Sequence, residues 1–313
     1  MTGPASLKHG LLEEASTIDG RASMRRNGKS FWFASLFLPR NVAADAAELY
    51  AFCRTMDDLA DESDDPRAVS RLNAVRLDLE RRTSDDPSVR TLLALARRYP
   101  LNLQVADHLI QAFVEDAKAK LQLADERELI RYCFGVAGTV GLMMSPILGA
   151  DPTQAHPAAI DLGIAMQMTN IARDVHEDAL NGRRYLPGSW VQNLAPSAIA
   201  CDDPRSRQPV ATAILRLLDL ADCFYASAAS GLRFIPSRSR PAIEVAATVY
   251  REIGVTLRLR GVPWWSARTV ISPVRKAALA ATVLAGASPL RRLPPASSTL
   301  ALHEPLNGLP GIV

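Results

Sequence analysis

Apolar residues recur along most of the chain three or four positions apart, which is the period of an amphipathic helix. Turn-forming pairs such as Asp86-Pro87, Tyr99-Pro100 and Asn181-Gly182 separate these stretches. No run of alternating apolar and polar residues predicts a strand, and no internal repeat is present. The stretches that we expect to be helical are residues 41–62, 67–82, 87–98, 102–120, 125–147, 157–178, 208–233, 240–260 and 273–286.

The order of these helices predicts one all-α domain that covers residues 22–286, with residues 1–21 as an N-terminal arm. Residues 183–206 carry no clear periodicity, so we expect an irregular segment there. From residue 287 onwards the chain is rich in Pro, Ser and Gly. We therefore expect residues 287–313 to form a disordered tail.

Composition favours a globular protein with a large core, since 48% of the 313 residues are hydrophobic and 22% are charged. The charge is uneven: residues 1–204 hold 22 basic and 28 acidic side chains, whereas residues 205–313 hold 14 basic and 5 acidic. The basic residues are scattered and no nucleic-acid motif accompanies them, so nucleic acid is not an expected partner. An anionic membrane surface is the better candidate partner for the basic half. An ordinary solvated surface is the simpler alternative.

The location that we expect is cytoplasmic, with the inner face of the membrane as a candidate docking place. The N-terminal sequence lacks the apolar run of a signal peptide, and no stretch approaches 18 consecutive apolar residues. Four cysteines occur, none in a C-x-x-C pair, which fits a reducing compartment.

The first chemically suggestive cluster lies near residue 57. On a helix, Arg54, Asp57, Asp58 and Asp61 share one face, because they are separated by three or four positions. Apolar residues upstream place this helix largely in the interior. Its carboxylates repel one another there, so they must either take up protons or bind a cation.

A second cluster repeats the pattern further along the chain. Gln167, Asn170, Asp174 and Asp178 form a polar stripe on an otherwise apolar helix. A solvated helix face is the alternative reading of either cluster alone, and His176 within it is more simply structural. Carboxylate and amide oxygens suit a hard cation, Mg²⁺ with Mn²⁺ as the alternative. Because magnesium completes its shell with water and substrate phosphates, two facing clusters would hold diphosphates between them.

Three segments, in this order, resemble the motifs of squalene and phytoene synthases, which join two prenyl chains head to head. They are Leu49–Asp61 with Ser30-Phe31 and Leu38-Pro39 upstream, Tyr132–Gly141, and Asn170–Asp178 with Gly182–Pro187 downstream. The similarity extends over residues 22–286. The Thr139–Met144 segment and the compact length are closest to bacterial phytoene synthases.

The resemblance implies the isoprenoid synthase fold, an all-α single domain with a central cavity between antiparallel helices. It implies as catalytic residues Asp57, Asp61, Tyr132, Asp174 and Asp178. It implies as magnesium ligands Asp57, Asp61, Asn170, Asp174 and Asp178. It implies as substrate-binding residues Ser30, Arg54, Gln167, Asn170, Arg173, Tyr250 and Arg268.

The activity that the resemblance implies is condensation of two geranylgeranyl diphosphates to phytoene, through a cyclopropyl diphosphate, in carotenoid biosynthesis. This reaction releases diphosphate and uses no NADPH. One alternative is a squalene-type or diapophytoene-type synthase that acts on farnesyl diphosphate. Another is an inactive relative that serves as an assembly protein, although both acidic clusters are complete.

Glycines recur every three residues at Gly135, Gly138 and Gly141. Glycine inside a helix costs up to about 1 kcal/mol per residue, so these positions need a reason. Close helix packing and room for a prenyl chain both supply one, and the sequence leaves the two open.

Overall fold

The computed structural model describes residues 19–61, 67–118, 121–201, 203–266, 268–294 and 299–312. Within these ranges every regular element is a helix, and the sole β-type pairing is an isolated bridge between Gln122 and Arg184. The all-α class expected from the sequence is confirmed.

The helices follow the predicted stretches closely from α3 onwards. The α-helices are α1 Gly20–Asn27, α2 Lys29–Ser35, α3 Arg40–Asp61, α4 Ala68–Arg81, α5 Pro87–Arg98, α6 Leu103–Lys118, α7 Glu126–Cys133, α8 Thr139–Ile147, α9 Pro152–Leu180, α10 Pro196–Ala200, α11 Pro204–Gly231, α12 Arg240–Leu259, α13 Pro273–Leu284 and α14 Thr299–His303. The other helical segments are η1 Phe134–Gly138, which is a π-helix, and the 3-10 helices η2 Gly188–Trp190, η3 Leu232–Phe234, η4 Pro289–Arg292 and η5 Glu304–Leu306.

Helix α9 begins five residues earlier than expected. Asp151 caps it by accepting a hydrogen bond from the Thr153 amide, and Pro152 occupies the first helical position, where a missing amide hydrogen costs nothing. Pro157 therefore lies inside the helix instead of starting it. The segment expected to be irregular contains the short α10 and η2 between loops.

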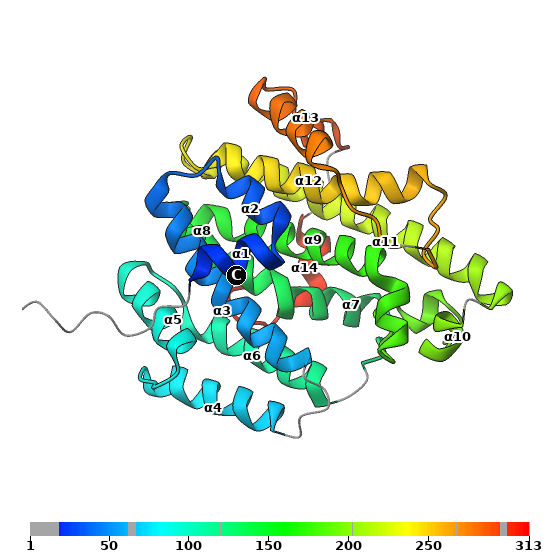
Figure 1. Cartoon of the computed structure of the whole chain (residues 1–313), viewed down its shortest axis with the longest axis horizontal. Helices are drawn as coiled ribbons and strands as arrows, with labels where there is room; N and C mark the ends of the chain where they lie inside the picture. The colour runs from blue at the N-terminus through cyan, green and yellow to red at the C-terminus, as the bar shows by residue number, and fades with distance from the viewer. Residues whose placement is uncertain are drawn as a thin grey trace, which may run out of the picture.

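The helices surround α9, which packs against α8, α10, α11 and α12 (Figure 1). Helices α4 and α13 lie at opposite ends of the molecule in this view, with α6 and α3 between α4 and the centre. Helix α12 lies between α13 and the centre. In the described part of the chain, one helical stretch, Glu126–Ile147, is long and apolar enough to span a membrane by length and composition alone. Within the protein, 61% of its apolar 18-residue window is buried. Because it packs between α6 and α9, it is a core element here.

Glycines allow α8 and α9 to cross at close range. A Cβ atom on Gly141 would lie 2.1 Å from the carbonyl oxygen of Ala159, and one on Gly163 would lie 2.3 Å from that of Ala137. No side chain fits at either position without moving the backbone. Gly141 of the central motif therefore serves close helix packing, one of the two reasons that the sequence left open, and it also lines the cavity.

The end of the chain corrects a sequence expectation. In place of a disordered tail, the described residues after 286 form η4, α14 and η5, with Leu290 and Leu306 buried. Arg131 donates a hydrogen bond of 2.8 Å to the Pro305 carbonyl oxygen. His303 Nε2 lies 2.6 Å from a carboxylate oxygen of the fully buried Asp161. These partners lie more than 140 positions upstream, so the local composition of the tail could not disclose them. Residues 1–18, most of the expected N-terminal arm, fall outside the described ranges.

Candidate active site

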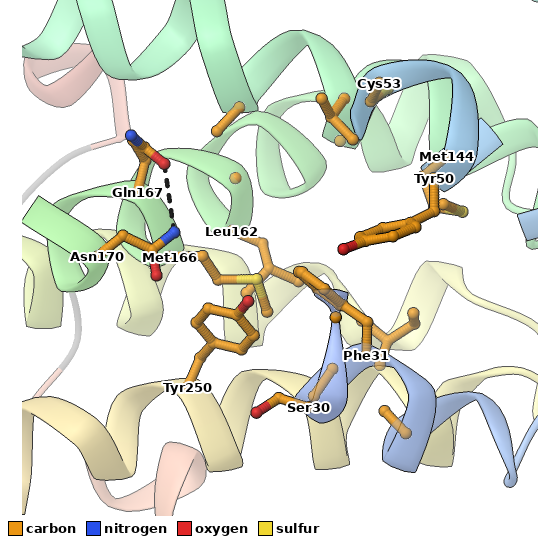
Figure 2. A pocket seen from close by; sticks show the side chains of 18 of the residues that line it. Ser30, Phe31, Tyr50, Cys53, Met144, Leu162, Met166, Gln167, Asn170 and Tyr250 are labelled. Carbon is orange, nitrogen blue, oxygen red and sulfur yellow. Dashed lines mark hydrogen bonds between the residues drawn. The ribbon is translucent and has the colours of Figure 1, made fainter. Parts of the chain in front are cut away.

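A cavity of about 660 Å³ lies in the middle of the helices. One face each of α2, α3, α9 and α12 lines it, together with the stretch from α7 to α8. Figure 2 shows side chains from these helices converging on the same space. A central cavity between helices is the architecture expected from the sequence motifs.

Helix α9 supplies the longest wall. Its cavity-lining residues recur every three or four positions along one face, and they are Ala155, Ala158, Ala159, Leu162, Gly163, Met166, Gln167, Asn170 and Arg173. At 1.5 Å per residue, this face runs for roughly 27 Å. It changes from small and apolar at its N-terminal end to polar and cationic at its C-terminal end. The cavity is therefore long and has one chemically distinct mouth.

At the mouth, the first acidic cluster is paired with arginines. Arg54 contacts both Asp57, at 2.7 Å, and Asp58. Arg183, from the segment after α9, lies 2.7 Å from Asp61. Arg54 and Asp57 line the cavity, while Asp61 lies one turn further along α3.

The second acidic cluster is paired in the same way. Arg173 and Arg268 both contact the Asp174 carboxylate, with shortest distances of 2.6 and 2.8 Å. Asn170 donates a hydrogen bond of 3.3 Å to Gln167, drawn as the dashed line in Figure 2. Its own side-chain oxygen is buried without a hydrogen-bond partner. A buried amide oxygen without a donor is costly, so this atom is free to receive a ligand.

Burial, together with neighbouring carboxylates, raises the pKa of one aspartate in each cluster. Burial raises the pKa of Asp57 to about 7, assisted by the charge of Asp61 and opposed by Arg54. Burial and the neighbouring Asp174 raise the pKa of Asp178 to about 8. Without a cation, both groups therefore hold protons near neutral pH, which was one of the two outcomes expected for such clusters.

Asp116 on α6 is a site residue that sequence reasoning missed. It is 8% exposed, and it accepts hydrogen bonds from the hydroxyls of Tyr132, at 3.0 Å, and Tyr185, at 3.1 Å. The two tyrosine rings stack with centroids 4.8 Å apart. Burial raises the pKa of Asp116, and its charge acts on both Asp57 and Asp178. Asp116 stands alone in the sequence, so no spacing signalled it.

Lys29 and Lys276 were also missed, and both line the cavity. Lys276 is 9% exposed, and burial together with the charge of Lys29 lowers its pKa. They lie far apart in the sequence, on α2 and α13, so only the fold brings them together. With the expected Arg54, Arg173 and Arg268, they give the cavity five basic side chains, of which the three arginines are paired with carboxylates.

Aromatic side chains line the cavity beside the mouth. The Phe31 ring lies 4.9 Å from that of Tyr250 and 6.0 Å from that of Tyr50, centroid to centroid (Figure 2). Burial raises the pKa of Tyr250 to about 12, so its hydroxyl stays neutral. Ser30 lines the cavity next to Phe31.

The structure thus brings together most of the residues expected from the sequence. Those that line the cavity are Ser30, Arg54, Asp57, Tyr132, Gln167, Asn170, Arg173, Tyr250 and Arg268. Asp61, Asp174 and Asp178 are not among the lining residues. Their contacts and electrostatic interactions are with the arginines and carboxylates of the mouth. His176 contacts the Ala200 carbonyl oxygen and the Trp264 ring, as expected of a structural histidine.

The donor set at the mouth fits magnesium. Within the described ranges, no three His, Cys, Asp or Glu side chains converge into a preformed metal site. Magnesium commonly uses only one or two carboxylates and takes its other oxygens from water and phosphate. The partnerless Asn170 oxygen and the proton-holding Asp57 and Asp178 supply suitable oxygen ligands.

Comparison with known proteins agrees with this geometry. The family model described as "Squalene/phytoene synthase" matches residues 24–275. A 15-cis-phytoene synthase from Paracoccus sp. (strain N81106 / MBIC 01143) is 36% identical over 273 residues, covering 82% of this chain and 87% of the relative. A phytoene synthase from Rhodobacter capsulatus is 36% identical over 253 residues, covering 78% of this chain and 74% of the relative.

Solved structures show the same fold. The crystal structure of a dehydrosqualene synthase with a ligand superposes with a TM-score of 0.77 at 29% identity, covering 85% of this chain and 94% of that one. A squalene synthase from Alicyclobacillus acidocaldarius has a TM-score of 0.67 at 23% identity, covering 77% and 92%. The described fold, the arginine-paired carboxylates and these matches agree: the chain belongs to the squalene/phytoene synthase family.

Proposed function

We propose that this protein condenses two geranylgeranyl diphosphates head to head into phytoene, through a cyclopropyl diphosphate, and releases two diphosphates. The observation that carries the proposal is the cavity, whose mouth, lined by arginines and carboxylates, opens onto an apolar wall on α9 that runs from Ala155 to Met166 for roughly 17 Å. A prenyl diphosphate has the same division, with a charged head and a long hydrocarbon tail. The phytoene synthases at 36% identity support the same product.

The magnesium ligands that we propose are Asp57, Asp61, Asn170, Asp174 and Asp178. When bound, Mg²⁺ or Mn²⁺ would neutralise charge on the departing diphosphate. The raised pKa values of Asp57 and Asp178 favour this assignment, because a bound cation would offset the burial and the carboxylate repulsion that raise them.

The basic residues of the mouth would bind the diphosphate oxygens. Arg54, Arg173 and Arg268 are now paired with carboxylates, whereas Lys276 is buried beside another lysine. Buried cations aimed at developing negative charge stabilise a leaving group more strongly than they would in water. Heterolysis of the carbon–oxygen bond then leaves an allylic cation in the cavity.

The apolar part of the cavity would protect that cation. Its small and aliphatic side chains exclude water, which would otherwise add to the carbocation. The faces of Phe31, Tyr50 and Tyr250 attract a cation without offering a reactive lone pair on the ring. The hydroxyls of the two tyrosines stay protonated, since burial raises the pKa of both to about 12.

The hydroxyl group of Tyr132 would be a neutral polar group held in one orientation. Its pKa is raised by burial and by Asp116, so its hydroxyl remains protonated, and the hydrogen bond to Asp116 fixes its direction. Tyr185 holds the other side of the same carboxylate. We assign Asp116 and Tyr185 as positioning residues that act through Tyr132.

A membrane location follows from the chemistry of the product. A forty-carbon hydrocarbon is nearly insoluble in water, so release into a bilayer avoids exposing it. We propose that the protein works in the cytoplasm as a peripheral protein on the inner face of the membrane.

Product analysis tests the proposal. The purified protein would be incubated with Mg²⁺ and either geranylgeranyl or farnesyl diphosphate, with and without NADPH, and the extracted lipid identified by mass spectrometry. We expect phytoene from the twenty-carbon substrate, at a rate that does not depend on NADPH. Turnover of farnesyl diphosphate alone would favour the squalene-type or diapophytoene-type alternative. The absence of any turnover would favour the inactive-relative alternative.

A further inference from the structure

Helix α13 is apolar on two opposite faces. The face toward the protein buries Leu279, Ala280 and Val283. The other face is exposed and consists of Val274, Ala277, Ala278, Ala281 and Leu284, spaced three or four residues apart. We call these five residues the α13 apolar face. An apolar helix face is normally covered, but only one of the two apolar faces of α13 is.

The α13 apolar face is strongly exposed and lies at the edge of the molecule. Val274 is 80% exposed and Leu284 is 58% exposed. Figure 1 shows α13 beyond α12, at the end of the molecule opposite α4. Among the described helices, its main packing partner is α12. No side chain of the described chain therefore covers this face.

The α13 apolar face adjoins the opening of the cavity. Val270, three residues before the helix, lines the cavity and is nevertheless 74% exposed. Lys276, on the first turns of α13, lines the cavity from the protein side. The same helix thus presents one side to the substrate space and the other side to the surroundings.

The charge around the α13 apolar face has one sign. Residues 253–303 contain no Asp or Glu. Their seven basic residues are Arg258, Arg260, Arg268, Arg275, Lys276, Arg291 and Arg292. Four of them are paired with carboxylates of other segments: Arg258 with Asp219, Arg268 with Asp174, Arg275 with Glu252 and Arg291 with Glu244. Arg260 and Arg292 are exposed and form no ion pair with a described carboxylate, so the local balance is modestly positive and suits an anionic surface.

We infer that the α13 apolar face docks on an anionic lipid bilayer, so that the cavity opens toward the membrane. This inference rests on the proposed function, because long-chain substrates and products are what would pass between bilayer and cavity. Apolar side chains on one side of a helix with cations nearby are characteristic of helices that lie in the membrane interface. A second copy of the chain is the poorer occupant, since a stable dimer buries about 800 Å² per partner over about 20–30 residues. The α13 apolar face has five residues.

Flotation with vesicles tests the docking site, with two matched leucine variants. Leu284→Glu places a charge on the α13 apolar face. Leu77→Glu does the same on α4, where the leucine is 50% exposed at the opposite end of the molecule. The vesicles would contain phosphatidylcholine alone or with phosphatidylglycerol. We expect the wild type to bind anionic vesicles at low salt, and we expect Leu284→Glu to lower the partition coefficient roughly tenfold or more. Leu77→Glu should change it less than about twofold.

Three results would overturn the docking site: equal losses in both variants, equal binding of the wild type to neutral and anionic vesicles, and no binding at low salt. Light scattering would identify the other occupant, because a dimer that Leu284→Glu dissociates would assign the face to a second copy. Turnover in detergent micelles separates this inference from the proposed function. Neither leucine lines the cavity, so both variants should retain wild-type turnover in micelles. A wild type that binds vesicles but turns over no substrate would instead contradict the proposed function alone.

Discussion

Replacing Asp57 with asparagine should stabilise the metal-free protein at high pH. In the folded protein the pKa of Asp57 is about 7, against 3.8 for an ordinary aspartate. The unfolded chain therefore loses this proton near pH 4, whereas the folded chain keeps it until about pH 7. The charged carboxylate destabilises the fold, and that penalty is absent below about pH 4, grows between about pH 4 and pH 7, and is complete above about pH 7. An asparagine side chain cannot ionise, so the variant escapes the penalty.

The size of the effect follows from the shift and from the exposure of the side chain. A shift of about 3 units would correspond to about 4 kcal/mol. The Asp57 side chain is 39% exposed, so solvent screening reduces the expected gain to about 1–2 kcal/mol. For a chain of this length, that free energy corresponds to a rise in Tm of about 2–4 °C. Arg54 keeps its contact with Asp58, so loss of the Asp57 charge leaves it paired.

Calorimetry in EDTA from about pH 5 to pH 9 measures this directly. The Tm difference between Asp57→Asn and the wild type should grow with pH up to about 7 and then level off. Saturating Mg²⁺ and diphosphate should abolish it or reverse its sign. Asp107→Asn is the control, because Asp107 pairs with Arg76 away from the cavity and should give no gain at any pH. A variant less stable than the wild type at about pH 8 would show that Asp57 is a structural ion-pair partner. A gain that is independent of pH would show that ionisation of Asp57 is not its cause.

Three other outcomes are expected. Chelation should abolish turnover, and added Mg²⁺ or Mn²⁺ should restore it; full activity after exhaustive chelation would contradict the metal assignment. Ala155→Phe, at the far end of the α9 wall, should lower turnover of geranylgeranyl diphosphate roughly tenfold or more relative to farnesyl diphosphate, and an unchanged ratio would place the chain end elsewhere. His303→Ala should cost about 2–4 kcal/mol, because it leaves the buried Asp161 with only Ser227 as a described hydrogen-bond donor. Thermal denaturation measures that loss. His303→Gln should recover part of it, and equal Tm values for the alanine variant and the wild type would show that the tail contributes little.

Periodicity and spacing predicted the fold well because the information is local. The i, i+3, i+4 pattern identified α3 and α9, and it correctly placed Arg54 and Asp57 on one face and Asn170 and Asp174 on another. Helix starts were less predictable. The sequence predicts a helix from residue 157, but α9 begins at Pro152, where Asp151 caps it.

The residues that sequence reasoning missed have in common that their partners are distant. Asp116 becomes part of the site only through Tyr132 and Tyr185, and Lys276 only through its approach to Lys29. The order of the C-terminal segment depends in the same way on the remote Asp161, which lies on α9. The pattern of residues in one sequence cannot predict these long-range contacts, because it shows only the neighbours of a residue along the chain.

The close crossing of α8 and α9 limits how the cavity can evolve. Gly141 and Gly163 line the cavity and also form the crossing, so a side chain added at either would displace the partner backbone instead of filling space. The cavity wall at this crossing therefore cannot gain side-chain volume without a backbone shift. Selection for a shorter or longer prenyl chain must act at other lining positions, such as Ser35 on α2, Ala155 on α9 and Ile243 on α12.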